Sequence, residues 1–174
     1  MRDMGLLVLR SVTGGIMAGH GAQKLFGAFG GPGLQGTAGF MESLGLTPGI
    51  HWARAAALSE FGGGVLTVLG LGGSLGPIGM ISSMSMATAK VHWGKPIWAT
   101  EGGAELPAVY IAAALAMGLA GPGRYSLDSA LGIKIPSAIV AAAVVTAATA
   151  LGWGIAAQPA PQPEAQELSG GEQV

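Results

Sequence analysis

The side chains that could do chemistry in this chain are few, and most lie within or beside long apolar stretches. Histidine and carboxylate groups exchange protons, whereas lysine, arginine and glutamine donate hydrogen bonds. Together they can bind a polar group and relay protons. The candidate site residues are Arg10, His20, Gln23, Lys24, Glu60, His92 and Glu105.

Several common kinds of site are excluded. The chain has no cysteine, which rules out disulfides, thiolate nucleophiles and cysteine-ligated metal centres. The GxGxxG spacing of Gly31, Gly33 and Gly36 follows an apolar helix instead of a strand, so it does not predict a dinucleotide site. Ser126 and Asp128 are expected on the opposite side from the histidines and make no catalytic triad.

The composition indicates a membrane protein. Of the 174 residues, 50% are hydrophobic and only 10% are charged, against about 25% charged in soluble chains. Because the net charge of −1 is close to zero, the chain lacks the basic surface that nucleic-acid binding requires.

Five stretches are long enough to cross a bilayer, which takes about 20 apolar residues. The first is read as an uncleaved helix because Arg10 divides its apolar region. The predicted spans are 4–22, 53–71, 77–93, 104–120 and 136–157. Pro77, Pro107 and Pro136 each lie in a first helical turn, where a missing N–H costs little. The predicted fold is therefore all-α, a polytopic transmembrane helix bundle.

With five alternating spans, all four tryptophans are placed at one water–lipid boundary, where such side chains concentrate. The first connection contains residues 34–44, whose apolar spacing predicts a helix in the interface plane. The acidic, proline-rich tail favours an N-terminus in the cytoplasm, with the tail on the other side.

Arg10 and Glu60 are the two charges deepest in the spans, where a charge costs about 2.5–3.5 kcal/mol. From the tryptophan boundary they lie about 15 Å and about 10 Å deep at 1.5 Å per residue. We expect the two to pair inside the bundle. Lys90 and His92 are 200° apart on an ideal helix, so we expect His92 to face inward and Lys90 to extend to the boundary.

Five motifs in order resemble the DoxX family of small bacterial and archaeal membrane proteins. The motifs are HGAQKLFGAFGGPG at 20–33, GLTPG at 45–49, Glu60 before GGG, GGAELP at 102–107 and GPGRYSLD at 121–128. The resemblance implies a four-helix membrane bundle over residues 1–131, to which this chain adds a fifth helix at 132–157 and a disordered tail at 158–174. It also implies the cytoplasmic membrane and all seven candidate residues, His92 being the least closely matched.

The resemblance further implies a link to respiratory quinones, because the related DoxD protein is a subunit of a thiosulfate:quinone oxidoreductase. We therefore expect an accessory subunit that binds a quinone headgroup in a polar pocket or anchors a redox partner, and that is not a complete enzyme. A non-catalytic assembly subunit of a larger membrane complex is the alternative. A haem between His20 and His92 is the least favoured interpretation.

Overall fold

The computed structural model describes residues 1–157, and these are helical throughout with no strand. Five long helices are joined by loops, two 3₁₀ turns, a π turn and two shorter helices. In chain order the elements are α1 (Arg2–Phe26), η1 (Ala28–Gly30), α2 (Gly33–Ser43), α3 (Gly49–Leu69), α4 (Leu75–Ala87), η2 (Thr88–His92), η3 (Ala99–Glu101), α5 (Glu105–Ala120), α6 (Leu127–Leu131) and α7 (Ser137–Ala156).

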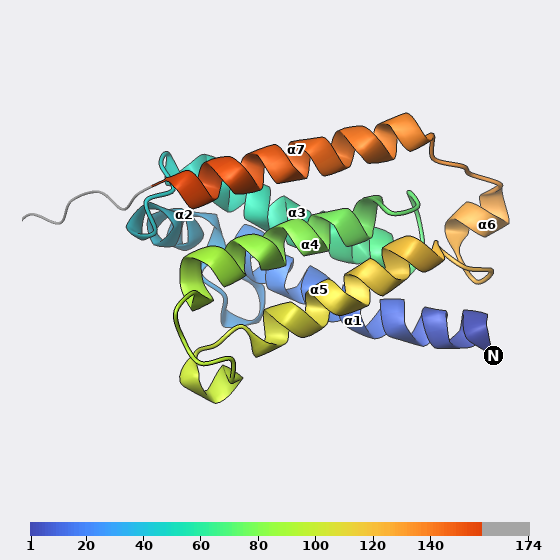
Figure 1. Ribbon diagram of the computed structural model, residues 1–174, viewed down its shortest axis with the longest axis horizontal. Coiled ribbons are helices and arrows are strands. Elements are labelled where there is room, and N and C mark those ends of the chain that lie inside the picture. The colour runs from blue at the N-terminus through green and yellow to red at the C-terminus, as the bar shows by residue number, and fades with distance from the viewer. Residues whose placement is uncertain (158–174) are drawn as a thin grey trace, which may run out of the picture.

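The long helices α1, α3, α4, α5 and α7 lie side by side and alternate in direction (Figure 1). Their bounds agree with the five predicted stretches to within a few residues, and the all-α fold is confirmed. The end of the bundle at which α1 and α7 finish also holds the start of α3 and the loop from η2 to α5. We call it the tryptophan end because it carries Trp52, Trp93, Trp98 and Trp153. The other end holds the N-terminus, the α3–α4 turn and α6 (Figure 1).

Glycine lets α1 and α3 approach very closely. A Cβ on Gly21 would lie 2.2 Å from the backbone nitrogen of Phe61, and one on Gly64 would lie 2.4 Å from that of Ala18. The GxxxG pair Gly15 and Gly19 is not at this contact, since a Cβ on either would meet nothing within 4 Å. The α1–α3 interface therefore uses a different set of glycines from the one that the spacing suggested.

A small core of methionine and alanine holds α1, α4 and α5 together. Met17, Met80 and Ala114 are fully buried and Met117 nearly so. Unbranched methionine side chains fill irregular gaps between helices, which suits a bundle with few large side chains inside.

The last long helix, α7, packs on α4 and is otherwise exposed. Within residues 1–157 it is the one helix that is both long and apolar enough to cross a membrane by composition alone, and 6% of its most apolar stretch is buried. Its one buried residue is Gly154, where a Cβ would lie 2.2 Å from Met86 Cε. Near this contact, the rings of Trp52 and Trp153 meet edge to face with centroids 6.4 Å apart.

The helix predicted at residues 34–44 is present as α2, and it packs against the start of α3. Ala38 and Met41 of α2 share a cluster with Leu46 and Ala53. The predicted tail at 158–174 lies outside the described residues.

Candidate functional site

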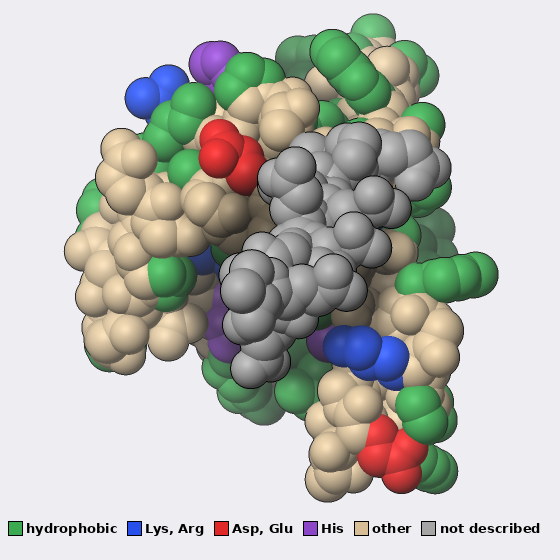
Figure 2. Space-filling view, turned by 90° about the vertical axis from the view of Figure 1, so that its left-hand side faces the viewer, with side chains coloured by type: hydrophobic (Ala, Val, Ile, Leu, Met, Phe, Trp, Pro, Cys, Tyr) green, Lys and Arg blue, Asp and Glu red, His purple; other side chains and the backbone are tan. Residues whose placement is uncertain are grey.

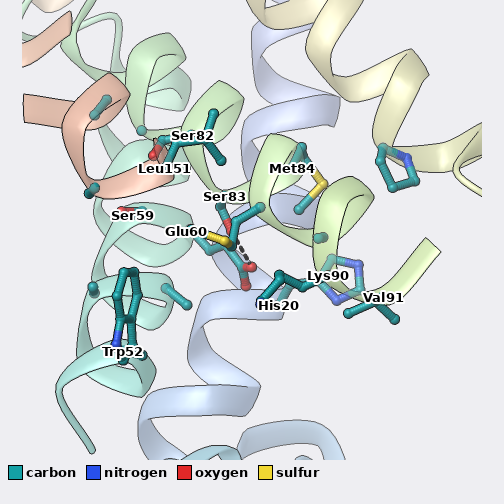
Figure 3. A pocket seen from close by; sticks show the side chains of 18 of the residues that line it. His20, Trp52, Ser59, Glu60, Ser82, Ser83, Met84, Lys90, Val91 and Leu151 are labelled. Atoms are coloured by element: carbon teal, nitrogen blue, oxygen red, sulfur yellow. Dashed lines mark hydrogen bonds between the residues drawn. The ribbon is translucent and has the colours of Figure 1, made fainter. Parts of the chain in front are cut away.

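Glu60 is the centre of the candidate site. It lies in the middle of α3 and is 3% exposed. Its Oε1 accepts a hydrogen bond of 2.6 Å from the Ser83 hydroxyl of α4, and its Oε2 forms an ion pair with Lys24 of α1. Three helices therefore bring one carboxylate and two donors together, as a buried carboxylate requires. Figure 3 shows Glu60 with Ser83 beside it.

This cluster lies in the wall of a cavity of about 740 Å³. The walls come from α1, α2, α3, α4, η2, α5 and α7, and most of the lining side chains are apolar. The polar exceptions are His20, Lys24, Ser59, Glu60, Ser82, Ser83, Lys90, His92, Tyr110 and Thr146. A mostly apolar cavity with a few convergent polar groups is the usual form of a small-molecule site, and about 300–1,000 Å³ is the usual size.

His20 and Gln23 hold each other on the last turns of α1. His20 Nδ1 donates to Gln23 Oε1 over 3.2 Å, which leaves Nε2 of the neutral ring as an acceptor. His20 lines the cavity at its exposed rim, whereas Gln23 does not line it. Gln23 instead packs against Gly31, because a Cβ added to Gly31 would lie 2.5 Å from Gln23 Cβ.

His92 lines the cavity, as expected, but Lys90, which was expected to extend to the boundary, lines it as well. Both residues lie in the π turn η2 that follows α4. Lys90 Nζ donates to the carbonyl of Ala157 at 2.6 Å, and His92 Nδ1 donates to the carbonyl of Gly102 at 2.6 Å. These bonds tie the cavity wall to the end of α7 and to the loop before α5.

Glu105 lies outside the cavity lining, although it starts α5 near the same end of the bundle. Its Oε2 accepts from the backbone N–H of Ala99 over 2.8 Å. The carboxylate thus fixes the loop that contains η3.

The expected pairing of Arg10 with Glu60 is wrong. Arg10 lies at the other end of the bundle, where a Cβ on Gly70 would almost touch its guanidinium. Gly70 is ten residues beyond Glu60, so about 15 Å of helix separates the two charges. Arg10 is 4% exposed and donates to the backbone carbonyls of Pro122 and Tyr125, while Glu60 takes the nearer Lys24.

The sequence analysis did not predict the contacts of two further polar residues. Ser83, which binds Glu60, stands in a run of serines and small residues with no distinguishing signal. Asp128 is 4% exposed and accepts from the backbone N–H groups of Gly72 at 3.0 Å and Gly73 at 2.6 Å. The sequence offered one signal for Asp128, since it is an aspartate in a predicted loop of a chain with few acidic residues.

The described residues form a helical bundle with a buried ion pair in the wall of a mostly apolar cavity. The DoxX family model matches residues 5–93, just over half of the chain, from α1 to the end of η2, and the chain belongs to the DoxX family. No curated protein and no solved structure matches the chain.

The matched residues include the motifs at 20–33 and 45–49 and Glu60 with its glycines. They supply Lys24, Glu60, Ser83 and His92, and hence most of the polar part of the cavity. The two later motifs, helix α5 and helix α7 lie beyond the match. Since DoxX is a membrane family, we treat this chain as a membrane protein.

Proposed function

We propose that this protein is a multi-pass subunit of a bacterial or archaeal cytoplasmic membrane whose cavity binds the headgroup of a respiratory quinone. The observation that carries the proposal is the Lys24–Glu60–Ser83 cluster in the wall of a large apolar cavity. An ionisable group kept inside a membrane bundle is costly, and such groups usually mark a functional site.

Helix lengths support the multi-pass arrangement. Helices α1, α3 and α7 have 25, 21 and 20 residues, and α4 with η2 forms a continuous 18-residue rod. A span of the hydrocarbon core takes about 20 residues, with a range of about 17–25. Helix α5, with 16 residues, is the shortest of the five. The charged residues deepest in α1 and α3, Arg10, Lys24 and Glu60, have partners inside the bundle, so they do not prevent these helices from lying in lipid.

The cavity fits a quinone chemically. A quinone ring is apolar on its faces and carries two carbonyl acceptors, and a bound quinone would supply the capacity to take up two electrons and two protons. Lys24 and the protonated form of His20 can donate to such carbonyls from the rim of the cavity. Glu60 can hold a proton, and Nε2 of His92 can accept one, since its Nδ1 is bound to Gly102.

The route for protons leads toward the tryptophan end. Lys24 is 25% exposed and His20 is exposed, whereas Glu60 is buried. Lys24 and His20 therefore lie between a proton on Glu60 and the water at the tryptophan end. In this proposal a partner subunit supplies the electrons.

The test is to purify the tagged protein in mild detergent and to measure extracted quinone per mole of protein. Glu60→Gln keeps the size of the side chain but removes its charge, and we expect it to lose most of the bound quinone. Glu105→Gln is the matched control, since Glu105 lies outside the cavity, and it should retain wild-type quinone content. A wild-type protein without quinone, or equal contents in both variants, would refute the proposal.

The same variants separate the alternative, a non-catalytic assembly subunit. In that case the partner complex would dissociate when this chain is deleted, while its quinone turnover would be unaffected by Glu60→Gln. Most of the apolar surface of α7 is exposed, and a partner subunit or lipid can cover it.

A further inference from the structure

The cavity is much longer than a headgroup. Its lining residues on α4 and η2 extend from Leu75, at the first turn of α4, to His92 in η2. Seventeen residues of helical rise correspond to about 25 Å, most of the thickness of a hydrocarbon core of about 30 Å.

The polar lining residues lie toward the tryptophan end and near mid-height, whereas apolar residues line the whole length. Lys24, Lys90 and His92 lie toward the tryptophan end, and Glu60 and Ser83 lie near mid-height. Beyond them, toward the other end, the lining of α4 consists of Leu75, Ile78 and Gly79. A headgroup bound at Glu60 therefore has an apolar channel beside it.

Helix α7 forms the far wall of this channel with small side chains. Its lining residues follow the spacing of a single helical face. They are Ala143, Thr146, Ala147, Ala150 and Leu151. Where a helix packs directly on its neighbour, such a face would be buried. Here Ala147 is only partly buried and Ala150 is exposed, so the face has space in front of it.

Contacts at both ends keep α7 in this position. At the tryptophan end, Gly154 meets Met86 and Lys90 binds the carbonyl of Ala157. At the other end, Ile135 lies before α7 and its Cγ1 is 3.3 Å from the position of a Cβ on Gly73. Between these contacts α7 spans the channel without closing it.

We infer that the channel between α4 and α7 holds the long isoprenoid tail of the quinone, with the ring at Glu60. This inference rests on the proposed function and adds a ligand class to it: the cavity selects a long-tailed quinone over the same ring without a tail. Small side chains on α7 determine the selection, because any larger one would occupy the space of the tail.

The experiment uses the full-length protein in lipid nanodiscs, stripped of bound quinone. Two probes are titrated, a decaprenyl benzoquinone and a tail-less benzoquinone with the same ring. Binding is followed by quenching of tryptophan fluorescence, since Trp52 lines the cavity (Figure 3).

Ala147→Phe should weaken binding of the tailed quinone at least about tenfold, which corresponds to about 1.4 kcal/mol. Binding of the tail-less ring should change less than about twofold. The matched control is Val145→Phe on the same helix, whose side chain is 64% exposed and outside the lining. It should leave both affinities unchanged. Should Ala147→Phe fail to fold, Ala143→Phe provides the same obstruction farther from the tryptophan end, where Ala143 also lines the channel.

The outcomes separate the two proposals. Wild-type protein that binds neither probe refutes the quinone function and the tail channel together. Two results refute the tail channel and leave the headgroup site in place. One is wild-type protein that binds the tailed and the tail-less quinone with equal affinity. The other is an Ala147→Phe variant whose affinity for the two quinones is unchanged, or is lowered by the same factor for both.

Discussion

Lys24 of α1 and Glu60 of α3 form an ion pair across the interface between the two most extensively packed helices of the bundle. Among residues 1–157 it is the only salt bridge, and Ser83 of α4 completes it from the other side. The carboxylate therefore both joins three helices and faces a cavity large enough for a ligand. Helix packing and the proposed ligand binding therefore depend on the same group.

The first prediction concerns the stability that this pair provides. Glu60→Leu leaves Lys24 without its carboxylate and Ser83 without its acceptor, so it should lower the free energy of unfolding by about 1–3 kcal/mol. The double variant Lys24→Met with Glu60→Leu should recover a large part of that loss, because replacing both partners by apolar groups removes the unpaired charge.

Unfolding by sodium dodecyl sulfate, followed by circular dichroism, measures these differences in a detergent-purified protein. Losses from Glu60→Leu and from Lys24→Met, each measured alone, that simply add in the double variant would show that the pair makes no net interaction.

A second prediction distinguishes two kinds of glycine on α1. Gly21→Ala places a methyl group 2.2 Å from the Phe61 backbone, which α3 cannot vacate without moving. We expect a loss of about 1–3 kcal/mol, as for other overpacked sites, and a lower melting temperature. Gly15→Ala has no neighbour within 4 Å. It should be neutral or should stabilise α1 by up to about 1 kcal/mol, since alanine is the better helix former.

Thermal melts of both variants in the same detergent test this contrast. If Gly15→Ala were the more harmful change, the packing of α1 against α3 described above would be incorrect.

A third prediction concerns the turn between α3 and α4. Asp128 binds two successive backbone N–H groups, those of Gly72 and Gly73. Asparagine has one carbonyl oxygen and one NH₂, so Asp128→Asn leaves one buried donor facing another. The expected loss is about 1–3 kcal/mol of stability, with faster amide hydrogen exchange at residues 70–75.

The control for this change is Asp3→Asn, since Asp3 accepts one exposed backbone bond from Arg124 at 3.2 Å. Unchanged exchange at residues 70–75 in Asp128→Asn would contradict the role assigned to this carboxylate.

The sequence was most informative where one helix determines the outcome. Long apolar stretches and prolines at first turns predicted the five long helices, because helix formation depends on local spacing and local caps. The choice of Glu60 as a buried charge also depended only on its place within one stretch.

Relations between helices were predicted less well. The partner of Glu60 depends on how far α1 is displaced along α3. In the structure Arg10 lies beside Gly70, ten residues beyond Glu60, and Lys24 reaches Glu60 instead. Lys90 likewise lines the cavity from the π turn, and no residue pattern of η2 distinguishes that turn from the helix before it. Both errors arise because the periodicity of a single α-helix determines neither its displacement along a neighbouring helix nor where it changes to a π turn.

The last prediction concerns Arg10, whose guanidinium binds two carbonyls of the loop after α5, those of Pro122 and Tyr125. Lysine keeps the charge but has a single ammonium in place of a planar fork, so Arg10→Lys cannot reproduce both bonds. We expect residues 121–128 to open more often, with faster hydrogen exchange there and a loss of about 1–3 kcal/mol. Arg2→Lys is the control, because Arg2 makes one exposed bond of 3.4 Å to Ala120. Quinone content should stay near the wild-type level in Arg10→Lys, since Arg10 lies at the other end of the bundle from Lys24 and does not line the cavity. A strong loss of quinone with no change in exchange would place Arg10 in the binding machinery and would contradict this assignment.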